Sequence, residues 1–149
     1  MTLFMRRFLA LGLLFAVFAC APLLAPFSEP AYEHATSLKA RSLAMVALSG
    51  DDFAAHDDEA RALLVDVDAA YEYAKGIPKN QLSTSAWNEM RDPSGGLLGE
   101  FVGKWQRSGQ QNAAFRAAKS EQIAQGFDVI ICLEVYKRAP QTCDSAEGQ

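Results

Sequence analysis

Hydrophobic residues recur at intervals of three and four along most of this chain. Between residues 51 and 76 they fall on one side of a helix with 3.6 residues per turn. The positions concerned are Phe53, Ala60, Leu63, Leu64, Val67, Tyr71 and Ala74. No stretch alternates apolar and polar residues convincingly, as a half-buried strand would. The pattern predicts an all-α fold.

Capping and helix-breaking residues predict where the first helices begin and end. Ser28 followed by Pro30 is typical of a helix start, and Gly50 is expected to end this first helix. An aspartate at 51 or 52 can cap a second helix, which is expected to end at Gly76. Both predicted helices are long enough to bury a continuous apolar stripe.

The second half of the chain carries a weaker and then a longer helical pattern. A short helix over 83–90 is broken by the turn residues at 92–96, and a further helix is expected over 97–108. The last predicted helix covers 112–138. Short turns that contain glycine favour antiparallel neighbours. We therefore expect residues 30–149 to form a small antiparallel bundle of about four helices, the third of them interrupted.

The N-terminus combines a charged start with a short apolar segment. Two arginines precede an apolar run from Phe8 to Ala19, which is the pattern of a signal peptide. A transmembrane helix is the alternative, because the uncharged run continues to Phe27. Pro22 and Pro26 would end such a helix after about 14 residues, or roughly 21 Å, against ~30 Å of hydrocarbon. The sequence favours a signal peptide over a membrane span.

The residues Val17-Phe18-Ala19-Cys20 resemble the lipobox of bacterial lipoproteins. The resemblance implies cleavage before Cys20 and acylation of that residue, so that 1–19 is a signal peptide and 20–29 a lipidated tether. Several acyl chains together hold a protein firmly on a bilayer. Ala21 stands where an inner-membrane retention signal usually has aspartate. The resemblance therefore implies the periplasmic side of the outer membrane.

The acidic residues of the chain are concentrated in one predicted helix. Residues 51–75 hold eight of the 18 acids against two basic residues. Removal of 1–19 would leave 12 basic and 18 acidic residues, a net charge of −6, which argues against nucleic-acid binding. The acids are either a docking face for a basic partner or cation, or a solvated helix face. Their position opposite Leu64 and Val67 favours the solvated face.

Two of the three cysteines remain if Cys20 carries lipid. Cys132 and Cys143 then form an even pair in an oxidising compartment. The chain after the helix stop at Ala139-Pro140 is long enough to return beside Cys132. We predict a disulfide bridge between Cys132 and Cys143 that staples the C-terminus, with two free thiols as the alternative.

Motifs of known catalytic or metal chemistry are absent from the sequence. His34 and His56 would be offset by about 15 Å along a hairpin that turns near Gly50, which is too far for a shared ion. No H-E-x-x-H, G-x-S-x-G or phosphate-loop motif occurs. We therefore expect no cofactor and no metal, and assign no catalytic residue.

Glu134 is the candidate buried carboxylate. It projects among the apolar residues of the last helix, which are Ile123, Phe127, Ile130 and Ile131. A carboxylate buried there would need a cationic partner. The alternative is that Glu134 reaches solvent past the edge of the core.

Gly99 and Gly103 are the candidate partner-contact residues. They stand four apart on one face of the predicted helix 97–108, opposite Phe101 and Trp105. Glycines in an exposed helix cost up to ~1 kcal/mol each relative to alanine, so a stacked pair suggests a notch for close backbone approach. The alternative is simply a weak helix.

Together these features predict a membrane-anchored periplasmic lipoprotein that acts as a non-enzymatic interaction or accessory module. Its partner would be another envelope protein or a second copy. One alternative is a bundle that binds a small apolar ligand or metal in a cavity among Trp87, Phe101, Trp105 and Phe127. The other is a hydrolase that uses Glu134. An open aromatic cavity would favour the ligand, a nucleophile brought to Glu134 in a polar cleft would favour the enzyme, and a filled core would favour the interaction module.

Overall fold

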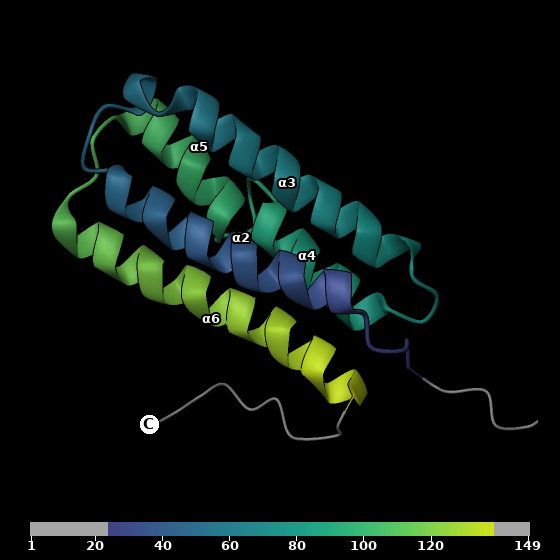
Figure 1. The fold of residues 1–149 in the computed structure, drawn as a ribbon. Helices are drawn as coiled ribbons and strands as arrows, with labels where there is room; N and C mark the ends of the chain where they lie inside the picture. Colours follow the sequence, from purple (N-terminus) through teal and green to yellow (C-terminus); the bar gives the residue numbers. More distant parts are fainter. Residues whose placement is uncertain (1–23, 139–149) are drawn as a thin grey trace, which may run out of the picture.

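The computed structural model describes residues 24–138, which form a helical bundle without strands (Figure 1). Its elements are α2 (Glu29–Leu48), the 3-10 turn η2 (Phe53–Ala55), α3 (Asp57–Gly76), α4 (Gln81–Arg91), α5 (Leu98–Ser108) and α6 (Ala113–Arg138). This confirms the predicted all-α bundle. The predictions for Cys20 and Cys143 concern residues outside the described range.

The predicted interruption of the third helix divides it into two separate helices. Consequently the described residues form five α-helices rather than about four. The chain turns between α4 and α5 through Pro93 and two glycines, of which Gly96 has a φ of +87°. Proline cannot continue the hydrogen-bond ladder, and a positive φ favours glycine, so the break is fixed by local chemistry.

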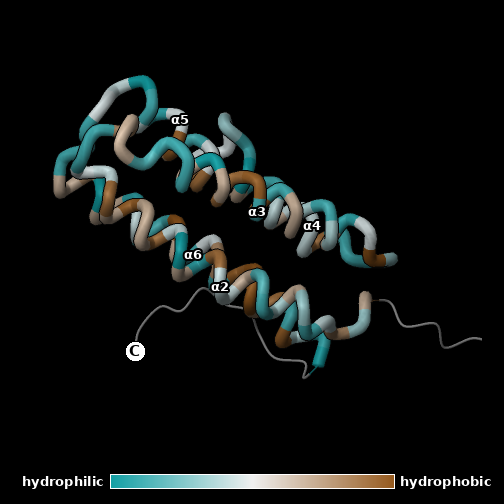
Figure 2. The backbone as a smooth tube through the Cα atoms, turned by 45° about the horizontal axis from the view of Figure 1, so that its top comes forward, coloured by the Kyte–Doolittle hydropathy of each residue, from teal (hydrophilic) through white to brown (hydrophobic). Residues whose placement is uncertain are grey.

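The helices form two layers, visible in Figure 2, with α2 beside α6 in one and α3 beside α4 in the other. Apolar segments of the layers face each other (Figure 2). α5 follows α4 and contacts η2 at the end of the bundle opposite the start of α2 (Figure 1). None of the helices in residues 24–138 combines the length and apolar character needed to cross a membrane.

The predicted start of the first helix is confirmed at atomic level. The Ser28 hydroxyl accepts a hydrogen bond from the Ala31 amide at 3.4 Å, and Pro30 lies in the first turn. The second helix begins later than expected, at Asp57, because residues 53–55 form the 3-10 turn. Its first turn still carries three acids, where they interact favourably with the helix dipole.

The aromatic residues form the centre of the core. Trp87 packs edge-on against Phe127 with ring centres 5.9 Å apart, and Trp105 packs edge-on against Phe53 at 5.1 Å. The indole nitrogen of Trp105 donates to the Asp51 carbonyl at 3.0 Å. This hydrogen bond ties α5 to the α2–α3 connection.

Candidate functional site

Three distant segments of the chain meet at the end of the bundle where α2 begins (Figure 1). We call this the tether end and define it as residues 24–30, 73–83 and 134–138. The Ala25 amide donates to the Lys79 carbonyl at 3.3 Å, and the hydroxyls of Ser28 and Tyr73 are 2.9 Å apart. The segment that precedes α2 is therefore fixed to the α3–α4 connection.

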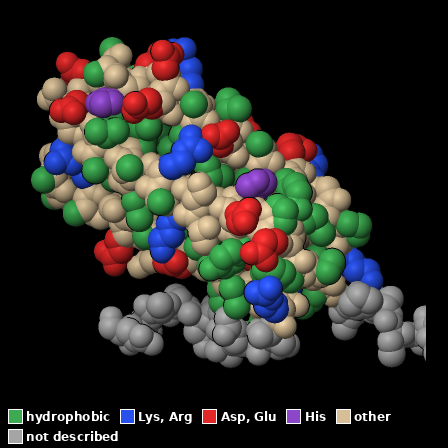
Figure 3. Space-filling view, viewed as in Figure 1, with side chains coloured by type: hydrophobic (Ala, Val, Ile, Leu, Met, Phe, Trp, Pro, Cys, Tyr) green, Lys and Arg blue, Asp and Glu red, His purple; other side chains and the backbone are tan. Residues whose placement is uncertain are grey.

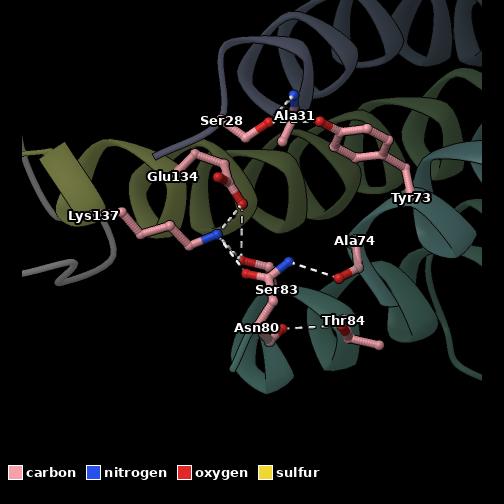
Figure 4. Close-up of polar contacts among 9 residues, drawn as sticks. All are labelled: Ser28, Ala31, Tyr73, Ala74, Asn80, Ser83, Thr84, Glu134 and Lys137. Atoms are coloured by element: carbon pink, nitrogen blue, oxygen red, sulfur yellow. Dashed lines mark hydrogen bonds and ion pairs between the residues drawn. The ribbon is translucent and has the colours of Figure 1, made fainter. Parts of the chain in front are cut away.

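Glu134 lies inside the tether end and is completely buried. Its Oε1 accepts hydrogen bonds from Lys137 Nζ at 2.6 Å and from Ser83 Oγ at 2.9 Å (Figure 4). The Lys137 side chain is only 7% exposed. Of the two alternatives left open by the sequence, Glu134 is therefore the buried carboxylate, and its cationic partner lies one turn further along the same helix.

Lys137 satisfies its hydrogen-bonding capacity within this cluster. Besides Glu134, its ammonium group contacts Asn80 Oδ1 at 2.5 Å and Ser83 Oγ at 3.1 Å (Figure 4). Asn80 in turn donates from Nδ2 to the Ala74 carbonyl at 2.8 Å. An ammonium group has three protons to donate, and three acceptors surround it here. The cluster thus joins the ends of α3 and α6 to the start of α4.

Sequence reasoning identified Glu134 but missed the residues that hold it. The spacing of Glu134 and Lys137 is a signal that was available, because side chains three apart on a helix are neighbours. Asn80 and Ser83 come from another helix, and nothing in their local sequence indicates that they meet a carboxylate.

A serine beside a lysine and a carboxylate is a combination that can support nucleophilic catalysis, so the cluster bears on the hydrolase alternative. A nucleophile must reach its substrate, however, and Ser83 is 1% exposed. Glu134 Oε2 is buried and lacks a hydrogen-bond partner among the described residues. The described residues therefore bring a nucleophile to Glu134 but give it no opening to solvent. Their arrangement suits a structural ion pair better than a reaction centre.

The four aromatic residues suggested for a ligand cavity are packed against other side chains. Trp87, Phe101, Trp105 and Phe127 are each at most 1% exposed. A surface hollow lies elsewhere, between α2 and α6, and its lining has no aromatic residue. It is lined by Leu43, Val46, Ala47, Ala113, Arg116, Ala117 and Ser120.

The prediction that both glycines of α5 face away from the core is wrong for Gly99. Gly99 is buried, and a Cβ atom there would lie 2.1 Å from the Arg91 carbonyl oxygen and 2.8 Å from that of Asp92. The close backbone approach is therefore intramolecular, at the corner between α4 and α5. A Cβ on Gly103 would meet only the Arg107 guanidinium, at 3.0 Å. A partner contact at Gly103 stays a prediction.

Two of the six acidic residues of α3 pair with cations from the neighbouring helices. Arg41 of α2 pairs with Asp66 at 2.6 Å, and Arg91 of α4 pairs with Asp68 at 2.9 Å. The hydrogen bond that Arg91 donates to the Asp68 carboxylate raises the pKa of the Arg91 guanidinium, which also lies 3.8 Å from the centre of the Tyr71 ring. These pairs support the interpretation of a solvated helix face that helps to align the helices.

The two histidines have separate surroundings. His34 packs edge-on against Tyr73 with ring centres 5.5 Å apart, whereas His56 lies 5.8 Å from Trp105. His56 also approaches Asp51 and Glu59, at 3.5 and 3.6 Å. Within residues 24–138, no three His, Cys, Asp or Glu side chains are grouped closely enough to hold a metal ion.

Cys132 lies half-buried in α6, and its predicted partner Cys143 is outside the described residues. We expect the denatured mature protein to contain no free thiol before reduction and two after it, because the acylated Cys20 cannot react. Closing this loop is expected to stabilise the domain by about 3 kcal/mol. Thiol titration before and after reduction counts the free thiols. Two free thiols in the unreduced sample would eliminate the bridge.

Comparison of the chain with protein-family profiles, with characterised proteins and with solved structures found no match.

Proposed function

We propose that this protein is a lipid-anchored envelope lipoprotein whose bundle acts through its outer surface, as a non-enzymatic interaction module. The observation that carries the proposal is the closed interior. Both places where an internal site was expected, the aromatic core and the surroundings of Glu134, are filled with packed or hydrogen-bonded side chains. A filled interior leaves the surface as the part that other molecules can reach.

The position of the tether supports attachment at a bilayer. Cys20 stands only four residues before Leu24, and a fully extended chain of this length spans at most about 14 Å. The bundle would therefore sit close to the membrane, with the tether end toward the bilayer and η2 pointing into the periplasm. A partner would be another envelope protein or a second copy.

We expect Cys20→Ser to release the protein from the membrane fraction. The substitution removes the sulfur that receives the diacylglyceryl group, and a tether without acyl chains has little to hold it in a bilayer. Membrane fractionation measures the retention. Intact-mass spectrometry of the parent should show the loss of residues 1–19 and the added mass of the acyl chains.

Cys132→Ser is the control for loss of a cysteine, and it should remain in the membrane fraction. An unmodified Cys20 with residues 1–19 still attached, or unchanged retention of the Cys20→Ser variant, would contradict the lipoprotein proposal. The same spectra under native conditions address the alternative. A small apolar molecule retained in a one-to-one ratio would favour ligand binding over an interaction module.

A further inference from the structure

We infer that the tether end is itself a membrane-contacting surface, which rests on a bilayer with anionic headgroups. The inference rests on the proposed lipid anchor but goes beyond it. An anchor alone allows the bundle to take any orientation, whereas this surface would fix the bundle upright on the membrane.

Exposed apolar side chains are concentrated at the tether end. Leu82 is 64% exposed at the start of α4, and Leu24 is 40% exposed in the segment before α2. Together with Tyr73 they make up three of the five large apolar side chains that are exposed among residues 24–138. Single exposed apolar residues are common on protein surfaces. These three, however, lie at the end of the bundle that the lipid anchor would hold near the bilayer. We therefore assign the membrane as their contact.

Cationic side chains accompany these apolar residues. The segment KGIPKNQL, residues 75–82, carries the exposed Lys75 and Lys79 and no acid, and Lys75 also pairs with the exposed Glu72 just before it at 3.4 Å. Arg138 ends α6 nearby, where it approaches Glu29 at 3.9 Å. Lysine and arginine beside apolar side chains are the composition that binds anionic lipid surfaces.

The opposite end of the bundle has the reverse character. Asp51, Asp52, Asp58 and Glu59 are exposed there. Figure 3 shows acidic side chains at this end and others nearer the tether end. The tether end, as defined above, carries four basic and two acidic residues, so an anionic surface would attract it more than the opposite end.

The length of the tether limits how far Leu24 can lie from the acylated cysteine. The headgroup region on each side of a bilayer is roughly 5–8 Å thick, and the chain from Cys20 to Leu24 spans at most about 14 Å. The hydrogen bond from the Ala25 amide to the Lys79 carbonyl holds the 75–82 segment beside it. Leu82 and the lysines are therefore kept within reach of the interface without further extension of the chain.

The test compares tryptophan introduced at two sites of equal exposure. Leu82 is 64% exposed and Val65 is 65% exposed, but Val65 lies 11 residues before the end of α3, or about 16 Å along the helix. Leu82→Trp and Val65→Trp variants of the full, acylated protein are placed in vesicles of phosphatidylethanolamine and phosphatidylglycerol. Brominated phospholipids in the same vesicles quench tryptophan that enters the acyl region.

The parent protein supplies the baseline quenching of Trp87 and Trp105. We expect Leu82→Trp to be quenched more than the parent, and Val65→Trp to be quenched no more than the parent. Adding Lys75→Gln to the Leu82→Trp variant should lower the docking equilibrium about fivefold, because this is the contribution of one lysine near an anionic surface. Equal quenching of the two tryptophan variants in acylated protein would overturn the docking surface and leave the anchor standing. Absence of acyl chains on Cys20 would overturn the proposed function itself, and the docking surface with it.

Discussion

Replacement of Lys137 by methionine is expected to lower the free energy of unfolding by about 3–5 kcal/mol. Methionine keeps an unbranched side chain that is one atom shorter than lysine, so the main change is the loss of the charged ammonium group. Glu134 would remain completely buried without its cationic partner, and Asn80 and Ser83 would each lose a donor. Urea unfolding followed by tryptophan fluorescence measures the loss, because the core contains Trp87 close to the cluster.

The chain provides a matched control for this variant in Lys75. Lys75 pairs with Glu72 at the same i,i+3 spacing as Lys137 with Glu134, but the two side chains are 55% and 62% exposed. Exposed ion pairs contribute little, so Lys75→Met should change stability by about 0.5 kcal/mol or less. Similar losses in the two methionine variants would show that burial of the Glu134–Lys137 pair does not determine its contribution.

A double substitution separates the ion pair from the packing around it. In Glu134→Leu combined with Lys137→Met, no charge remains buried, and most of the stability lost in Lys137→Met should return. Failure of the double variant to recover would indicate that the hydrogen bonds to Asn80 and Ser83, rather than the paired charges, hold the helix ends together.

Replacement of Gly99 by alanine is expected to destabilise the bundle by about 1–3 kcal/mol, although alanine favours helix by about 1 kcal/mol. The new methyl group would lie 2.1 Å from the Arg91 carbonyl oxygen, and backbone cannot move aside as a flexible side chain can. The α4–α5 corner must therefore open. The shift of the urea unfolding midpoint measures this change.

Gly103→Ala is the control, and the opposite sign is expected. Its methyl group would meet only the Arg107 guanidinium, which can rotate away, so the variant should gain up to about 1 kcal/mol from helix propensity. If Gly99→Ala also stabilised the protein, the corner between α4 and α5 would not be as tight as the structure has it. If Gly103→Ala weakened capture of an envelope partner without loss of stability, Gly103 would be a contact residue.

Much of the fold was available in the sequence because helices are specified locally. The apolar period of three and four residues predicted the all-α class. Ser28, Pro30 and Gly50 predicted the limits of the first helix to within two residues. The start of α3 was misplaced, because an aspartate at 51 or 52 can cap a helix as well as Asp57 can begin one. The tertiary contact of Trp105 with the Asp51 carbonyl accompanies the 3-10 turn found there instead.

Only part of the candidate site could be predicted from the sequence, because local sequence specifies helices but not the contacts between them. Periodicity shows which side of a helix faces the core, and this was enough to make Glu134 a candidate buried carboxylate, with solvent contact past the core edge as the alternative. It does not show which residues of other helices lie opposite. The assembly of Asn80, Ser83 and Lys137 around Glu134, and the fit of Gly99 against Arg91, depend on how far each helix is rotated and shifted against its neighbours. Those two quantities are set by packing of the whole core, and only the tertiary structure decides them.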